Sequence, residues 1–354
     1  MSVVHFKEIL RKSLDCYWKK TISFNDKPTV LFCRESEKTF FEKFSCQFKV
    51  RFDKMLCNFS LENFFEILDN NKNYFFSNHI MTDKLYKSLV NAGINCDNIY
   101  IGPTKNAYFD LYQKRNIIHE NIESINTVYY LLEDDKSRRI FLQIITRLCL
   151  PYQFHYFYEP DDDPQYFPKE FDFDKDEVFL DAGVCDGQNI FEFIEYVQGH
   201  YKYIYGIEAD ENNFNLSKDN LSGIERLELV KGALFSQKGE QLNFRSSQMT
   251  GRRGNPHIQT DGDIIVSTIN GDSLRYTPTF IKMDIEGSEK EALTGLEKTI
   301  KSHGPKLAIC IYHFQKDFWE LPLLIKRLNP KYKLMIRNHE RLFTLLESVC
   351  YAYV

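Results

Sequence analysis

Two carboxylates and a histidine stand in this sequence where apolar, strand-like runs end. Asp284 follows the run 280–283, and Glu286 lies two residues further on. His313 follows a second run, 307–312. Parallel strands end at the same edge of a sheet, so the three side chains are expected to converge there. A histidine, with an ordinary pKa near ~6.5, can accept a proton from a weak nucleophile. We therefore expect His313 to be a general base, oriented by Asp284 or Glu286.

Two further polar residues accompany this set. Lys282 lies on the same face of its strand as Asp284, so it either orients Asp284 or only pairs with it structurally. His339 follows a later strand and is expected to contact substrate. For His313 and His339 the alternative is a structural histidine. Carboxylates suit Mg²⁺, but only Asp284 and Glu286 are close in sequence, so we expect no metal.

A glycine turn follows an earlier strand. Residues 177–189 read Glu-Val-Phe-Leu-Asp-Ala-Gly-Val-Cys-Asp-Gly-Gln-Asn, which predicts a strand, a tight turn and the start of a helix. A dinucleotide fingerprint needs glycines at 183, 185 and 188, but Cys185 and Gln188 occupy two of these positions. A P-loop needs Gly-Lys-Ser/Thr, where this chain has Gly-Gln-Asn. The turn therefore does not favour a bound pyrophosphate.

The same turn suits S-adenosylmethionine (SAM). Glycine lets the methionine and ribose parts of this ligand approach the backbone, and Asp181 at the strand exit can bind the α-amino group. Glu208 ends the next strand, where a carboxylate can bind the ribose diol. An acid there also serves NAD, and it can simply be a solvated strand end. The expected cofactor-binding residues are Asp181, Gly183, Val184, Cys185, Gly187, Asn189, Glu208, Ala209, Gly232, Ala233 and Asp284.

The second half of the chain has the pattern of an open α/β sheet. Strands are expected at 178–180, 203–207, 227–230, 241–244, 264–269, 280–283, 307–312, 332–336 and 348–354. Asp210 is an expected helix N-cap, and Ser288 and Glu291 have the spacing of a capping box. A later helix is expected to become regular near 321–322, because Pro322 is tolerated only in a first turn.

The first half predicts a smaller α/β domain with strands at 29–33, 48–52, 74–76 and 99–101 and a helix at 83–91. No glycine-rich phosphate loop follows these strands, so scaffolding, homo-oligomerisation or acceptor recognition is expected. Helices are expected at 2–19 and within 105–149, where Asp135 is the expected cap. The expected domains are a small α/β domain (1–104), a helical connector and linker (105–176) and a cofactor-binding domain (177–354).

Composition limits the class of protein. The chain has 354 residues, of which 43% are hydrophobic, so it can form a packed core. Its net charge of −5 argues against broad nucleic-acid or anionic-membrane binding. The nine cysteines form no Cys-x-x-Cys pair, which argues against a zinc knuckle and favours reduced thiols in the cytoplasm. No run approaches the ~18 apolar residues of a membrane helix. We expect a cytoplasmic protein.

The second half resembles the FkbM family of SAM-dependent methyltransferases over about residues 165–354. The resemblance is carried by residues 179–187, by Gly-Ile-Glu-Ala-Asp at 206–210, and above all by Phe-Ile-Lys-Met-Asp-Ile-Glu-Gly-Ser-Glu at 280–289. Family members read Lys-x-Asp-x-Glu-Gly-x-Glu at the last position. The resemblance implies a Rossmann-like class I methyltransferase sheet with a terminal antiparallel strand pair. Residues 311–313, 317–319 and 337–339 look like a bacterial subgroup linked to glycan or capsule biosynthesis.

These observations together predict O-methylation of a sugar, nucleotide sugar or glycan precursor. A sugar hydroxyl is a poor nucleophile at neutral pH, which explains the need for a base. Arg252 and Arg253 can bind the diphosphate of a nucleotide sugar, or they belong to a solvated loop. Two alternatives stay open: an NAD-dependent oxidoreductase, which Cys185 and Gln188 disfavour, and a non-catalytic SAM-binding assembly subunit, which the polar strand ends disfavour.

Overall fold

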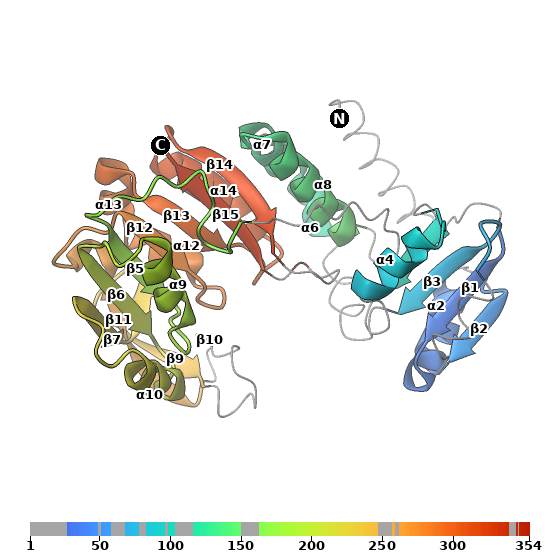
Figure 1. Cartoon of the computed structure of the whole chain (residues 1–354), viewed down its shortest axis with the longest axis horizontal. Coiled ribbons are helices and arrows are strands. Elements are labelled where there is room, and N and C mark those ends of the chain that lie inside the picture. Colours follow the sequence, from blue (N-terminus) through green and yellow to red (C-terminus); the bar gives the residue numbers. More distant parts are fainter. Residues whose placement is uncertain are drawn as a thin grey trace. The chain divides into compact units, whose positions relative to one another are not determined.

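The computed structural model describes residues 27–48, 51–57, 68–77, 83–95, 98–102, 116–149, 163–246, 257–258, 262–339, 345 and 347–354. The chain divides into two compact units, whose elements are labelled in Figure 1. The first comprises 1–125, 139–160 and 340–345, and the second comprises 126–138, 161–339 and 346–354. The division passes through helix α7 (Ile122–Leu131) and just after the start of helix α8 (Asp135–Cys149). No helix in the described ranges is long and apolar enough to span a membrane.

The first unit contains a four-stranded parallel sheet in the order β2-β1-β3-β4. Its elements are β1 (Thr29–Cys33), η1 (Glu35–Glu37), α2 (Lys38–Phe48), β2 (Lys54–Cys57), β3 (Asn73–Ser77), α4 (Asp83–Asn91), β4 (Ile99–Gly102) and α6 (Asn116–Glu120). Phe32 and Phe76 stack on one face of the sheet, where Leu85 of α4 joins their buried cluster. Phe41 of α2 packs edge-on against Phe75 on the other strand face.

Most of the predicted elements of this unit are confirmed, but the prediction of one strand is wrong. The alternation of Phe48, Val50 and Phe52 imitates a strand, yet Phe48 ends helix α2 and the second strand lies at Lys54–Cys57. The helix expected at 2–19 lies outside the described residues. The cap of α8 is Asp134, one residue before the expected position, because its carboxylate accepts the Ser137 N–H at 2.8 Å.

The second unit contains a seven-stranded sheet in the order β14-β15-β13-β12-β5-β6-β7. All of its strands are parallel except β15, which runs antiparallel between β13 and β14. The strands are β5 (Val178–Ala182), β6 (Tyr203–Glu208), β7 (Leu227–Lys231), β12 (Phe280–Met283), β13 (Lys306–Cys310), β14 (Lys333–Asn338) and β15 (Ser348–Tyr353). The strand order reverses between β5 and β12, and ligands of such sheets bind at that point. The expected fold class is confirmed.

The helices of this unit are α9 (Gln188–Tyr196), α10 (Glu211–Asn220), α12 (Glu289–Thr294), α13 (Glu297–His303) and α14 (Asp317–Leu328), with the short turn η4 (Gly271–Ser273). A second sheet in the order β10-β9-β11-β8 is inserted between β7 and β12. It consists of β8 (Ala233–Phe235), β9 (Gln241–Arg245), β10 (His257–Ile258) and β11 (Ile264–Asn270).

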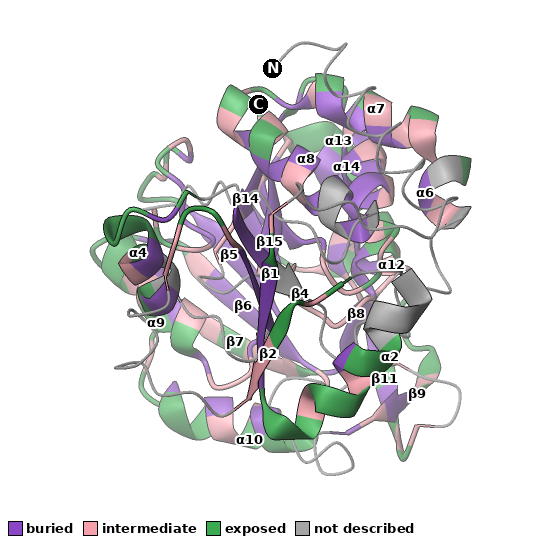
Figure 2. Ribbon diagram, turned by 90° about the vertical axis from the view of Figure 1, so that its right-hand side faces the viewer, coloured by how far each residue is buried: buried purple, intermediate pink, exposed green. Residues whose placement is uncertain are grey.

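Aromatic side chains fill one face of the large sheet. Phe179 and Phe280 lie on adjacent strands and stack with ring centroids 4.7 Å apart. Phe193 of α9 and Phe173 of the segment before β5 pack against the same pair. The central strands are buried along their length (Figure 2). Burying each such ring contributes roughly 1.5–3 kcal/mol, so this cluster fixes the strands whose ends form the site.

Two local expectations in this unit are wrong. Ser288 caps α12 without a side-chain hydrogen bond, and Glu289, not Glu291, reaches back to accept the Ile285 N–H. Helix α14 begins at Asp317, so Pro322 lies in its second turn. The buried apolar face of α14 outweighs the hydrogen bond that the proline cannot donate.

Gly183 is expected to tolerate no side chain. It has φ +82°, and an added Cβ would lie 1.9 Å from the Asp284 carbonyl oxygen. We expect Gly183→Ala to separate the turn from β12, to abolish SAM binding in calorimetry and to lower the free energy of unfolding. The control is Gly199→Ala, where φ is +75° but the space is open; its cost should be only about 1 kcal/mol. Equal stability of the two variants would contradict this reading.

Candidate active site

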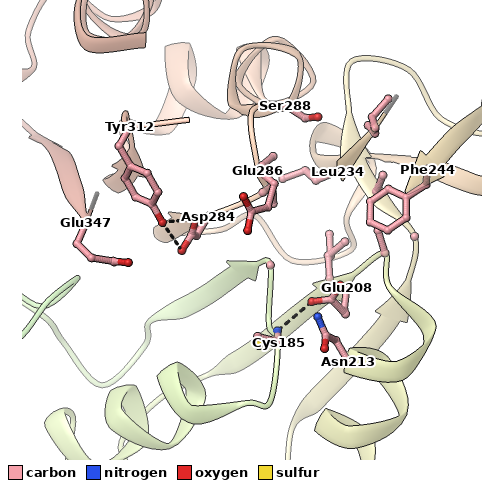
Figure 3. Close-up of a pocket in the computed structure, with 17 residues that line it drawn as sticks. Cys185, Glu208, Asn213, Leu234, Phe244, Asp284, Glu286, Ser288, Tyr312 and Glu347 are labelled. Atoms are coloured by element: carbon pink, nitrogen blue, oxygen red, sulfur yellow. Dashed lines mark hydrogen bonds between the residues drawn. The ribbon is translucent and has the colours of Figure 1, made fainter. Parts of the chain in front are cut away.

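A cavity of about 320 Å³ opens at the carboxyl ends of β5, β6, β7, β12 and β13 (Figure 3). The turns after these strands supply most of its lining, and the rest comes from the end of β6, from α10, from the second sheet and from the residue before β15. The lining residues are Gly183, Cys185, Ile207, Glu208, Ala209, Asn213, Gly232, Ala233, Leu234, Phe244, Ile258, Asp284, Ile285, Glu286, Ser288, Tyr312 and Glu347. Seven of the expected cofactor-binding residues are among them: Gly183, Cys185, Glu208, Ala209, Gly232, Ala233 and Asp284.

Glu208, the last residue of β6, lines the cavity. Its Oε2 accepts the Cys185 N–H at 2.9 Å, and its Oε1 accepts the Asp210 N–H at 2.8 Å. Burial raises its pKa to about 7, although the two N–H donors lower it. A carboxylate can accept about four hydrogen bonds, so each oxygen keeps capacity for a ribose hydroxyl. The neighbouring side chains of Leu234, Phe244 and Ile258 are apolar and fit an adenine ring. A carboxylate acceptor beside this apolar lining suits SAM.

Four expected cofactor residues do not line the cavity. Asp181 is fully buried because β5 continues through it to Ala182, and it pairs with Lys282 across the β5–β12 register. Val184 is buried in the core beneath the turn. Gly187 starts α9 in the left-handed conformation, and Asn189 lies on that helix. The prediction that Asp181 contacts the SAM amino group directly is therefore wrong.

Lys282 stabilises the glycine turn from the buried side. Its Nζ lies 2.9 Å from Asp181 Oδ1 and donates to the Gly183 carbonyl oxygen at 2.7 Å. The side chains of Lys282 and Asp181 are 1% and 0% exposed. Burial alone lowers the pKa of Lys282, but Asp181 and Asp284 raise it above its ordinary value. Lys282 is a buried structural cation and does not reach the cavity.

Asp284, Glu286 and His313 do converge, as expected from their strand ends. His313 Nε2 lies 3.2 Å from Asp284 Oδ1 and 3.4 Å from Glu286 Oε2. Its Nδ1 lies 3.0 Å from Glu289 Oε1 on the other side of the ring. The hydroxyl of Tyr312 donates to both oxygens of Asp284, at 3.1 and 3.2 Å.

The charges of this cluster contradict the expected role of His313. Burial alone lowers the pKa of His313, but the nearby carboxylates of Asp284 and Glu289 raise it to about 11. The ring is therefore protonated near neutral pH and has no lone pair for a substrate proton. Burial raises the pKa of Asp284, yet His313, Lys282 and Tyr312 lower it to about 2. The pKa of Glu286 is raised to about 7, mainly by burial. The charge of His313 lowers this pKa, and the charges of Asp284 and Glu289 raise it.

Three non-glycine residues of the cavity have left-handed backbone. Cys185, Glu286 and Glu347 have φ values of +54°, +55° and +57°. Such conformations cost free energy and gather at functional sites, where the surrounding fold imposes them. At Glu286 the conformation turns the chain directly after the strand exit, which places its carboxylate on the cavity.

Sequence reasoning missed Tyr312 and Glu347. Tyr312 directly precedes His313 at the end of the β13 segment, so its position on the sheet edge could have been recognised. Glu347 precedes the antiparallel strand β15, which begins at the edge where the parallel strands end. Its carboxylate accepts a hydrogen bond from Gln165 at 2.6 Å.

Three further predictions concern the substrate contact of His339, the arginine loop and the absence of a metal. His339 does not line the cavity, since its Nε2 lies 2.7 Å from the Tyr351 hydroxyl. Arg252 and Arg253 lie outside the described residues. Atoms of Asp284, Glu289 and His313 lie within 4.8 Å of one another, as metal ligands can. However, the ring stands between the two carboxylates and turns a different nitrogen toward each, so we propose no metal.

Replacing Glu208 with alanine should weaken SAM binding about 10²- to 10⁴-fold, because two hydrogen bonds to a charged group, of roughly 1.5–3 kcal/mol each, are lost. Calorimetry would measure this, with Glu195→Gln on the exposed side of α9 as control. Since only the ionised Glu208 accepts both ribose hydroxyls, affinity should fall about tenfold between pH 8 and pH 6. A pH-independent affinity would argue against this contact.

Comparison with known proteins identifies the family and the fold. Residues 181–351 match the sequence profile of the methyltransferase FkbM domain. The chain is similar to the crystal structure of methyltransferase FkbM from Methylobacillus flagellatus KT, with 18% identity, 98% of each chain covered and a TM-score of 0.64. At that identity, the likeness shows the fold.

Two other similar structures cover half of this chain. One is an rRNA methylase from Streptococcus thermophilus, with 17% identity, 51% of this chain and 87% of that chain covered, and a TM-score of 0.34. The other is precorrin-6y C5,15-methyltransferase from Geobacter metallireducens GS-15, with 13% identity, 51% of this chain and 80% of that chain covered, and a TM-score of 0.32. No curated protein sequence gives a significant match. The profile match sets aside the nicotinamide alternative and confirms SAM as the cofactor. Residues 181–351 of this chain are an FkbM-family domain, and the protein is a SAM-dependent methyltransferase.

Proposed function

We propose that this enzyme transfers the methyl group of SAM to a hydroxyl of a sugar, nucleotide sugar or glycan precursor. The observation that carries the proposal is the Glu286 carboxylate, which faces the cavity with a pKa of about 7. A base with its pKa near the working pH is the most effective acceptor of a hydroxyl proton. Hydroxyl acceptors need such a base, because the neutral alcohol is a poor nucleophile.

The residues divide the work between binding and proton transfer. SAM supplies an activated methyl group on its sulfonium sulfur. Glu208 binds the ribose, and Asp284, held ionised by Lys282, His313 and Tyr312, presents negative charge to the cationic cofactor. Glu286 accepts the hydroxyl proton while the acceptor oxygen bonds to the methyl carbon and the carbon–sulfur bond breaks. Alignment of oxygen, methyl and sulfur supplies most of the remaining rate enhancement.

Support for a sugar acceptor comes from the lining beyond Glu208. Asp284, Glu286 and Glu347 contribute carboxylates and Tyr312 a phenol, and no lysine or arginine is among the described lining residues. Carboxylate oxygens accept hydrogen bonds from hydroxyl groups, which a sugar supplies in number. The resemblance to a glycan-linked subgroup points the same way.

We also propose that the first unit recognises the acceptor or joins two copies of the chain. Its first strand leads into Arg-Glu-Ser-Glu at 34–37, with no glycine-rich phosphate loop. Removing this unit would then reduce acceptor affinity or change the oligomeric state, without preventing SAM from binding.

The test is to incubate the enzyme with methyl-labelled SAM and a panel of nucleotide sugars and sugar phosphates. Mass spectrometry should show one added methyl group, stable to mild base as an ether is and an ester is not. Glu286→Gln is the matched control, because it keeps the shape of the side chain but cannot accept the proton. Label found on amines or carboxylates, and never on a hydroxyl, would overturn the proposal.

A further inference from the structure

Glu289 is a buried carboxylate that the chemistry above does not use. It is the first residue of α12 and is 1% exposed. Its Oε1 accepts the Ile285 N–H at 3.0 Å and lies 3.0 Å from His313 Nδ1. The backbone bond fixes this oxygen relative to the loop that carries Asp284 and Glu286. A carboxylate so buried requires a function or a compensating charge.

The His313 ring connects Glu289 to the cavity. The ring is 7% exposed, and its Nε2 faces the oxygens of Asp284 and Glu286 at 3.2 and 3.4 Å. Both ring nitrogens therefore face carboxylates. A neutral ring would turn one lone pair toward a carboxylate oxygen, whereas an imidazolium turns an N–H and a positive charge toward the carboxylates on both sides.

We propose that Glu289 is a positioning residue which, through His313, fixes the orientation of Glu286 as the acceptor of the substrate proton. This inference rests on the proposed function. Glu289 orients the ring from behind and raises its affinity for the proton, and the cationic ring holds the Glu286 side chain at the cavity wall. Neither Glu289 nor His313 lines the cavity, so neither acts on the substrate directly.

The charges around Glu286 determine what the variants should do. His313 faces it as a cation, and Asp284, Glu289 and Glu347 face it as acids. Asp317 and Glu347 also interact with His313 from the start of α14 and from before β15. Burial and the acids raise the pKa of Glu286, whereas His313 lowers it. Loss of Glu289 and loss of His313 therefore act on Glu286 with opposite signs.

The first experiment is the pH dependence of kcat/KM. Glu289→Gln removes a negative charge, so the acid limb, expected near the Glu286 pKa of about 7, should move down by about one pH unit. The pKa of His313 is about 11 in the wild type, so the ring should stay protonated near neutral pH in this variant. His313→Gln removes the positive charge, and the limb should move up. Glu289→Asp should restore the wild-type limb, and Glu291→Gln on the same helix should leave it unchanged.

The second experiment needs no acceptor. Nitrogen-15 NMR of histidine-labelled enzyme reports the ring charge, and loss of one signal in His313→Gln assigns the resonance. In the wild type this ring should remain an imidazolium up to about pH 9, and in Glu289→Gln it should titrate at lower pH. Thermal melts and SAM calorimetry check that each variant folds.

The outcomes separate the two proposals. A neutral His313 at pH 7, or limbs that move in the same direction in Glu289→Gln and His313→Gln, would overturn the role of Glu289. Absence of methyl transfer by the wild type, with His313 cationic in NMR and dependent on Glu289, would overturn the proposed function and leave the pairing established. If Glu289→Gln fails to fold, Glu289→Asp and His313→Gln still give the NMR assignment and the upward shift.

Discussion

Glu286→Gln is expected to lower kcat for methyl transfer by about 10²- to 10⁴-fold, the range that general base catalysis contributes. Glutamine keeps the shape and polarity of the side chain but cannot take the hydroxyl proton. SAM affinity should change little, because the proposed ribose contact is made by a different side chain of the cavity, Glu208 (Figure 3). Steady-state kinetics and calorimetry on the same preparation would measure both quantities.

Glu286→Asp is the control for this prediction. It keeps a carboxylate but shortens its reach by one methylene, so its rate should lie between those of the wild type and Glu286→Gln. The variants should also differ in pH dependence, since only a carboxylate titrates. Full activity of Glu286→Gln would remove Glu286 from the mechanism.

Lys282→Met is expected to lower the free energy of unfolding by about 3–5 kcal/mol, the cost of breaking a buried ion pair. It leaves Asp181 without its cation in the core and the Gly183 carbonyl oxygen without its donor. The glycine turn should loosen as a result, so SAM binding should weaken in the fraction that stays folded. Urea unfolding followed by fluorescence would measure the loss.

The double variant Asp181→Leu Lys282→Met separates charge from packing. Replacing both partners of a buried pair by apolar residues is often neutral, so the double variant should be more stable than Lys282→Met alone. A double variant with the summed loss of its two single variants would show that the pair is not energetically coupled.

The sequence was sufficient to locate the site residues that lie at the ends of strands. Glu208, Asp284 and Glu286 each follow a buried apolar run, and parallel strands bring such positions to one edge whatever their separation in sequence. The glycine turn was located from an apolar run, two glycines and the helical spacing after them, whereas the close approach of Gly183 to the Asp284 carbonyl oxygen appears only in the structure. Fold class and cofactor followed from these few positions.

The roles within the cluster could not be read in the same way. Asp181 was expected at the strand exit, but β5 continues one residue past it and the β12 register places Lys282 beside it. Burial then decided its role. For His313, the number of surrounding carboxylates determines the charge of the ring, and Glu289 reaches it only through the turn into α12. Such contacts depend on tertiary packing that no spacing rule encodes.

A structure with S-adenosylhomocysteine and an acceptor nucleotide sugar tests the account most directly. It should show the ribose diol on Glu208 and one sugar hydroxyl within about 3.2 Å of a Glu286 oxygen, the reach that a general base needs. His313 should remain enclosed between Asp284 and Glu289. A sugar ordered away from Glu286, or a cofactor ribose that does not touch Glu208, would contradict the account.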